Sequence, residues 1–170
     1  MKRRDCLALL GASSLLLAGC ASTGTPPSLV GTGDLGVVVA RSTGTLAIVN
    51  TSSRKLLAEV KGLGDLSHAS VVFSRDGRHA YVFGRDGALT KVDLLTQRIA
   101  GRVMQAGNSI GGAISADGSL VVAQNYTPGG IKAFDTATLE LVADVPAEFE
   151  PGRLSRVVGL VDLPGRRFAY

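Results

Sequence analysis

The sequence is poor in the residues that most often carry cross-links, thiol chemistry or zinc. Among 170 residues it has two cysteines, two histidines and no tryptophan. Both cysteines, Cys6 and Cys20, lie within the first twenty residues, so the chain beyond them has no disulfide and no thiol for catalysis or metal binding. That part of the chain must be held together by its hydrophobic core alone.

Common functional motifs are missing as well. The sequence has no glycine-rich phosphate loop, no nucleophile elbow and no paired zinc ligands. The formal net charge is +4, of which residues 2–5 (KRRD) contribute +2, so the remainder carries only +2. A charge this small, without a dense Lys/Arg stripe or an aromatic ladder, argues against nucleic acid as a partner.

The first twenty residues have the pattern of a bacterial export signal. Basic residues 2–4 precede an apolar segment at 7–17, which is too short to span a bilayer stably. The segment ends in LAGC at Cys20, which resembles a lipobox. We therefore expect residues 1–20 to be a lipoprotein signal peptide whose Cys20 is lipidated, so that only a lipid anchor touches the membrane. The alternatives are a plain secretory signal and, from the arginine pair at 3–4, twin-arginine export.

Residues 21–33 are rich in Ser, Thr, Gly and Pro and are predicted to form a flexible tether. Beyond the tether the sequence repeats with a period of about 42 residues. The polar markers Asn50, Asp93 and Asp135 are spaced 43 and 42 residues apart. A repeat of this length is typical of propellers and solenoids.

Within the repeats, short runs of β-branched and aromatic residues are joined by Asp-Gly, the strongest local signal for a hairpin. Each full repeat contains four strand candidates: 69–74, 79–84, 88–92 and 98–104, then 111–115, 119–124, 130–134 and 140–145. Four antiparallel strands in 40 to 45 residues is the size of one β-propeller blade, with a β-sandwich as the alternative. We predict an all-β chain with about three and a half blades. Since propellers close as rings of roughly four to eight blades, residues 34–170 are expected to be the N-terminal part of a longer, eight-bladed propeller.

Polar side chains recur at equivalent places in the repeats. His68, Asn108 and Arg156 each precede the first, innermost strand of a repeat, which for Arg156 is a strand expected at 157–161. Such strand ends surround the central channel of a propeller. We therefore expect these three side chains to lie at one mouth of the channel.

A second set follows the next strand of each repeat. Arg41 and Arg85 occupy matching turns, and Asn125 and Tyr126 take that place in the third repeat. Arginine forms forked, charge-assisted bonds with carboxylates, and a neutral imidazole can bind a metal or move a proton. Together these residues suit a flat polycarboxylate ligand, including one that carries iron. The alternative is structural: a hydrogen-bonding histidine and solvated arginines.

Three stretches carry a resemblance to a known family: SHASVVFSRDGRHAYVFGRDGALTKVDL, QAGNSIGGAIS and FDTATLELVADVP. They resemble the NirF family, the haem d1 biosynthesis proteins of denitrifying bacteria. That pattern is related to the haem d1 domain of cytochrome nitrite reductase, an eight-bladed propeller. The likeness covers residues 34–170 and implies a periplasmic protein that binds haem d1 or a late precursor at the channel mouth.

The resemblance also implies roles for individual residues. His68 is the expected axial ligand to the haem iron or the acid–base residue. The expected carboxylate partners are arginines: Arg41, Arg85 and Arg156. Asn125 and Tyr126 are expected to line the pocket. Asn108 stands where the reductase has an arginine, so a different ligand geometry is expected there.

For function, the resemblance implies maturation of haem d1, with dehydrogenation of a propionate side chain as one possible reaction. The alternatives are a carrier that delivers haem d1 to nitrite reductase, or a propeller scaffold for protein partners. Nitrite reductase and other haem d1 assembly proteins are the implied partners. The sequence contains no Cys-x-x-Cys-His motif for c-type haem, so it is not itself expected to be a nitrite reductase.

Overall fold

The computed structural model describes residues 31–170, which form β-strands and one 3-10 turn, η1 (Thr32–Asp34). The predicted signal peptide, its Cys20 and the first ten residues of the predicted tether lie outside the described residues. Within the described part, no helix is long and apolar enough to cross a membrane.

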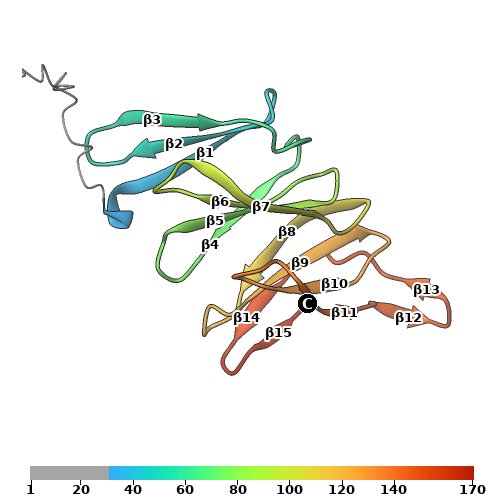
Figure 1. Ribbon diagram of the computed structural model, residues 1–170. Helices are drawn as coiled ribbons and strands as arrows, with labels where there is room; N and C mark the ends of the chain where they lie inside the picture. Colours follow the sequence, from blue (N-terminus) through green and yellow to red (C-terminus); the bar gives the residue numbers. More distant parts are fainter. Residues whose placement is uncertain (1–30) are drawn as a thin grey trace, which may run out of the picture.

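Three antiparallel sheets follow one another along the chain, each with its strands in sequence order. The first contains β1 (Leu35–Ala40), β2 (Thr45–Asn50) and β3 (Lys55–Val60). The second contains β4 (Ser70–Phe73), β5 (His79–Phe83), β6 (Ala88–Asp93) and β7 (Arg98–Met104). The third contains β8 (Asn108–Ile114), β9 (Leu120–Thr127), β10 (Ile131–Asp135) and β11 (Leu141–Val145). Figure 1 shows these sheets succeeding one another from top to bottom, like blades.

Two hairpins complete the described chain. One pairs β12 (Glu148–Glu150) with β13 (Arg153–Leu154), and the other pairs β14 (Val161–Leu163) with β15 (Arg167–Ala169). The all-β prediction and the two four-stranded repeats are confirmed. The strand expected at 157–161 is wrong: residues 155–160 are irregular and β14 begins only at Val161. Val157 N donates one hydrogen bond to Asn125 O at 3.1 Å, and a single bond does not make a ladder.

The Asp-Gly turns explain why the repeat is visible in the sequence. In the turn after β4, Ser74 Oγ donates to Asp76 Oδ1 at 2.5 Å, and the same aspartate accepts from a backbone N–H two residues on. The turn after β8 repeats this with Asp117, and the glycine after each aspartate has a positive φ, 69° and 76°. Glycine adopts that conformation without a steric penalty. The motif therefore encodes its turn almost entirely by itself.

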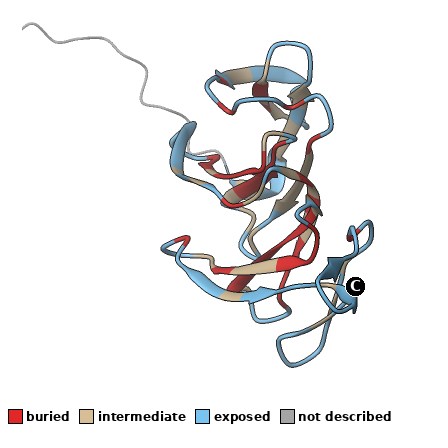
Figure 2. Ribbon diagram, turned by 90° about the vertical axis from the view of Figure 1, so that its right-hand side faces the viewer, coloured by how far each residue is buried: buried red, intermediate tan, exposed pale blue. Residues whose placement is uncertain are grey.

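The core lies where successive sheets face each other. Between the first two sheets it includes Leu46, Ile48 and Val82, all essentially inaccessible. Between the next two it includes Phe83 and Phe134. Figure 2 shows the buried residues running through the middle of the sheets, whereas the turns and the two last hairpins are mostly exposed. Burial between sheets, rather than within one, makes each blade depend on its neighbours.

The innermost strands approach closely because β8 carries glycine at a crowded position. A Cβ built on Gly112 would collide with the Phe83 ring and with Val122 O. Arg75 reinforces this contact by donating to Ser115 O at 3.0 Å and to Asp162 Oδ2 at 2.9 Å. The second sheet is thereby tied both to the third sheet and to β14.

Candidate functional site

A polar hollow of about 340 Å³ lies at the rim where the β5–β6 and β9–β10 turns meet the connections between sheets. Its lining residues come from the connection before β4, the β5–β6 turn, strands β8 and β9 and the segment after β13: His68, Arg85, Asn108, Ile110, Tyr126, Thr127 and Arg156. Five of the seven residues that the sequence singled out are therefore gathered around one hollow. No Asp or Glu is among the lining residues, so the charged groups there are basic.

Backbone hydrogen bonds between turns and connections hold this rim together. Arg85 N donates to Asp65 O at 2.9 Å, which ties the β5–β6 turn to the connection that carries His68. Gly107 N donates to Thr127 O at 3.0 Å, which ties the connection before Asn108 to the end of β9. The hollow is thus framed by main-chain contacts that do not depend on the side chains lining it.

The two arginines of the hollow are available to a ligand. Asp86, the neighbour of Arg85, is instead engaged by Arg102 at 2.8 Å. Across residues 31–170, no carboxylate lies within ion-pair distance of Arg85 or Arg156. The Arg156 guanidinium instead lies 5.4 Å from the centre of the Tyr126 ring. A guanidinium over an aromatic face is held in place while its N–H groups stay available for an anion.

Asn108 provides the second indication of a missing ligand. Its side chain lines the hollow, yet Oδ1 is buried with no hydrogen-bond partner. It is the one such side-chain atom found in the described part of the chain. Because a buried acceptor without a donor costs about 1–3 kcal/mol, this amide is expected to find its partner outside the chain.

Two of the expected site residues are not placed in the hollow. Asn125 is fully buried beneath it, where its amide exchanges two hydrogen bonds with Gln105, at 2.9 and 3.0 Å. Arg41 is exposed in the β1–β2 turn, one sheet further along, and is not among the lining residues. Neither Asn125 nor Arg41 lines this hollow, and their expected contacts with a ligand stay predictions.

Gln105 is the residue that sequence reasoning missed. It is 7% exposed and its amide pairs with Asn125, which directly precedes Tyr126 on β9. Asn125 O also accepts from Val157 N, next to Arg156. The pair therefore supports both partners of the Arg156–Tyr126 stack. No sequence signal marks it, because a lone glutamine between two strands looks like an ordinary connection residue.

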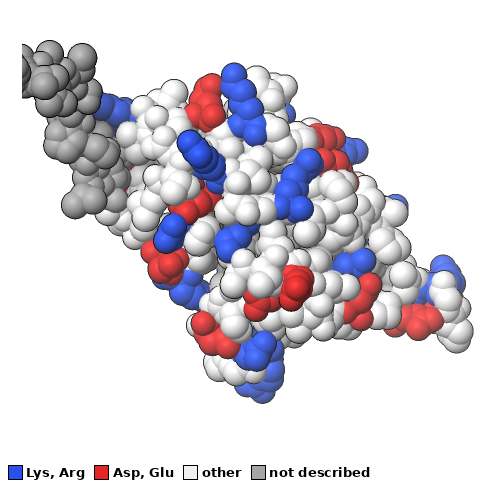
Figure 3. Space-filling view, viewed as in Figure 1, with Lys and Arg blue, Asp and Glu red and all other residues white. Residues whose placement is uncertain are grey.

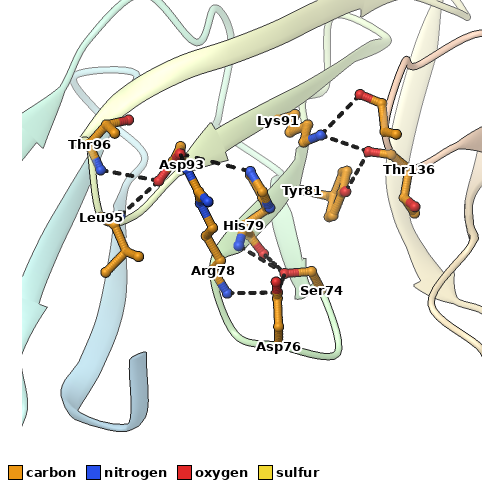
Figure 4. A network of polar contacts seen from close by, with 11 residues as sticks. Ser74, Asp76, Arg78, His79, Tyr81, Lys91, Asp93, Leu95, Thr96 and Thr136 are labelled. Atoms are coloured by element: carbon orange, nitrogen blue, oxygen red, sulfur yellow. Dashed lines mark hydrogen bonds and ion pairs between the residues drawn. The ribbon is translucent and has the colours of Figure 1, made fainter. Parts of the chain in front are cut away.

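A second polar network lies at the other end of β5 and is structural (Figure 4). Arg78 donates to Asp93 Oδ2 at 2.8 Å, and His79 Nε2 lies 4.0 Å from the same oxygen. Burial alone would raise the pKa of Asp93, but the Arg78 guanidinium and two backbone N–H groups outweigh it and lower that pKa to about 2. Burial lowers the pKa of His79, and its charged neighbours Lys91 and Arg78 add to this. His79 starts β5 and Arg85 follows its end, so this histidine lies on the opposite rim from the hollow.

Charge over the wider surface is mixed. Figure 3 shows basic and acidic side chains interspersed over the visible face, without an extended patch of one sign. Among residues 31–170, no three His, Cys, Asp or Glu side chains gather into a candidate metal site.

Residues 30–170 match the family described as Cytochrome D1 heme domain. The chain belongs to this family. The lining of the hollow fits such a ligand, since a haem carries carboxylates that Arg85 and Arg156 can bind.

Two NirF proteins are similar to this chain. Protein NirF of Stutzerimonas stutzeri is 62% identical over 164 residues, which cover 95% of this chain and 41% of the relative. Protein NirF of Pseudomonas aeruginosa is 62% identical over 157 residues, which cover 91% and 39%. The chain thus spans about two fifths of the length of these relatives. A dihydro-heme d1 dehydrogenase of Pseudomonas aeruginosa is 36% identical over 99 residues, 58% of this chain and 20% of the relative.

Solved structures give the same picture of the fold. Dihydro-heme d1 dehydrogenase NirN in complex with DHE superimposes with a TM-score of 0.75 at 29% identity, covering 88% of this chain and 32% of that one. Kuenenia stuttgartiensis hydrazine synthase superimposes with a TM-score of 0.60 at 18% identity, covering 68% and 35%, and supports the fold alone. The sheets therefore correspond to part of a haem d1 propeller.

Proposed function

We propose that the protein binds haem d1 or a late tetrapyrrole precursor in the polar hollow and takes part in its maturation. The observation that carries the proposal is the lining of the hollow: two arginines without a carboxylate partner, a histidine, and an amide oxygen with no donor. The similarity to NirF proteins and to a dehydrogenase crystallised with DHE supports the tetrapyrrole as ligand.

Each side chain has a definite task in this proposal. Arg85 and Arg156 bind carboxylates of the macrocycle, and the Tyr126 ring keeps the Arg156 guanidinium in place. Asn108 Oδ1 accepts a hydrogen bond from an N–H or O–H group of the ligand. His68 would hold the iron of a bound tetrapyrrole or would move a proton at the edge of its ring.

The finer proposal is dehydrogenation of a propionate side chain. The side chain loses two hydrogens and gains a carbon–carbon double bond. His68 takes one as a proton, and the other leaves with both electrons to an external two-electron acceptor. The competing function is a carrier that hands haem d1 unchanged to nitrite reductase. Mass spectrometry of the bound tetrapyrrole after incubation with an acceptor separates them, since a carrier leaves the mass unchanged and dehydrogenation lowers it by about two mass units.

Titration of the full-length protein with haem d1 tests binding directly. We expect His68→Ala to change the Soret spectrum, and Arg85→Ala or Arg156→Ala to weaken binding by about tenfold to a hundredfold, because each loses a charge-assisted bond. Arg98→Ala is the matched control, since Arg98 is exposed at the start of β7 and away from the hollow. Equal affinity and identical spectra for all four variants and the parent would refute the proposed site.

We also propose that Cys20 carries the lipid that holds the protein on a membrane facing the periplasm. The support is the lipobox-like LAGC sequence alone. Cell fractionation is the test. The parent protein is expected in the membrane fraction, and the Cys20→Ser variant is expected outside it. Equal membrane association of both would contradict lipidation.

A further inference from the structure

A second hollow, of about 450 Å³, adjoins the polar one, and Arg156 lines both. Its walls come from the β12–β13 hairpin, the segment after it and Tyr170. Most of its lining residues are apolar, among them Pro146, Phe149 and Val158, and the polar ones are Glu148, Ser155 and Arg156. A basic hollow and a mostly apolar one therefore share Arg156.

The apolar hollow exists because one connection between sheets is long. Residues 105–107 suffice to join the second sheet to the third, whereas 146–160 join β11 to β14 and contain a hairpin of their own. Figure 1 shows this β12–β13 hairpin projecting from the side of the molecule. The β12–β13 hairpin is therefore an addition to the four-stranded repeat.

The base of the hairpin is fixed to the rim of the polar hollow. Ser155 N donates to Ala147 O at 2.7 Å, and Gly130 N donates to Ser155 O at 3.3 Å. Val157 N donates to Asn125 O, directly below the polar hollow. The hairpin is therefore held beside the ligand site by main-chain bonds.

Two apolar side chains of the second hollow are exposed to solvent, and one of them is restrained by a neighbouring residue. Phe149 is 55% exposed and Val158 66% exposed. The Arg153 guanidinium lies 4.8 Å from the centre of the Phe149 ring and restricts it. An aromatic side chain that is exposed yet restrained loses little entropy when a flat ligand covers it.

We propose that the apolar hollow is the second half of the tetrapyrrole site, where Phe149 and Val158 contact the apolar part of the macrocycle while Arg85 and Arg156 bind its carboxylates. This inference rests on the proposed function. A tetrapyrrole is a flat apolar ring with carboxylates at its edge. The mostly apolar hollow suits the ring, and the basic hollow suits the carboxylates. Arg156, shared by both, marks the boundary between them.

The test compares two probes, haem d1 and its carboxylate methyl esters, on the full-length protein. Phe149→Ala is expected to weaken binding of both probes about tenfold, because it removes most of an aromatic contact area. Arg85→Ala is expected to weaken binding of the free acid only. Phe149→Leu, which keeps an apolar contact, is expected to retain part of the affinity. The matched control is Leu141→Ala, since Leu141 is equally exposed (53%) on β11 but lines neither hollow.

The results of this test distinguish a failure of the apolar half of the site from a failure of the proposed tetrapyrrole binding. If Phe149→Ala and Leu141→Ala both bind the two probes like the parent, while Arg85→Ala loses the free acid, the apolar half is refuted and the polar site stands. If the parent itself binds neither probe, the proposed function fails. Since Phe149 is exposed, its truncation is expected to leave the melting temperature unchanged, and the melting temperature is measured alongside.

Discussion

The buried amide pair between Gln105 and Asn125 offers the sharpest test of how the rim is built. The substitution Gln105→Met keeps most of the side-chain volume but removes both hydrogen bonds to Asn125, at 2.9 and 3.0 Å. Asn125 is 0% exposed, so water cannot replace the lost partner without a rearrangement. Leaving a buried polar group unpaired costs about 1–3 kcal/mol, and here both the donor and the acceptor of one amide are affected. We expect a loss of about 3 kcal/mol in the free energy of unfolding.

The measurement is urea unfolding of the full-length protein, followed by circular dichroism. The double variant Gln105→Met with Asn125→Leu is expected to recover part of the loss, because no amide is then left unpaired. Gln97→Met is the control, since Gln97 is exposed in the β6–β7 turn, and it should change stability by less than about 0.5 kcal/mol. If Gln105→Met is as stable as Gln97→Met, the pair does not support the rim and the reasoning is wrong.

Three further perturbations test the packing of the sheets. Gly112→Ala is expected to destabilise the protein by about 2 kcal/mol or more in urea, because its Cβ would collide with neighbouring atoms, whereas Gly33→Ala has open space and should be neutral. Arg75→Ala, followed in the same way, is expected to cost about 1 kcal/mol, a modest value because the side chain is half exposed. Asp93 has a folded pKa of about 2, below its ordinary value, so its contribution is present above about pH 4 and lost as the pH falls toward 2. Removing the charge with Asp93→Asn should abolish about 2 kcal/mol of acid sensitivity between pH 4 and 2; an unchanged pH profile of stability would contradict the assignment.

The strands and tight turns could be predicted from the sequence because their causes are local. The Ser-x-Asp-Gly turns form through bonds that span two to five residues, so the motif and its structure repeat together. The eight strands expected for the two complete repeats are present with shifts of only a few residues at their ends. The period of about 42 residues likewise follows from a blade being one unit of four strands.

Tertiary contacts determine which of the expected residues line the polar hollow. Arg41 and Arg85 occupy the same place in their repeats, but only Arg85 has the neighbouring connection and β8 beside it. Asn125 and Tyr126 are adjacent on β9, yet successive side chains of a strand point to opposite faces, so one is buried and the other lines the hollow. Which face is buried depends on the sheet packed against it.

By itself, the sequence determined the strands, their turns and the repeat, because these depend on backbone preferences and hydrogen bonds within a few residues. Only the tertiary structure decided that Gln105 supports the rim, that residues 155–160 leave the strand pattern, and that an apolar hollow adjoins the basic one. The first two depend on contacts between segments twenty or more residues apart, and the third depends on how residues 146–159 pack beside Tyr170. No local sequence pattern specifies this packing.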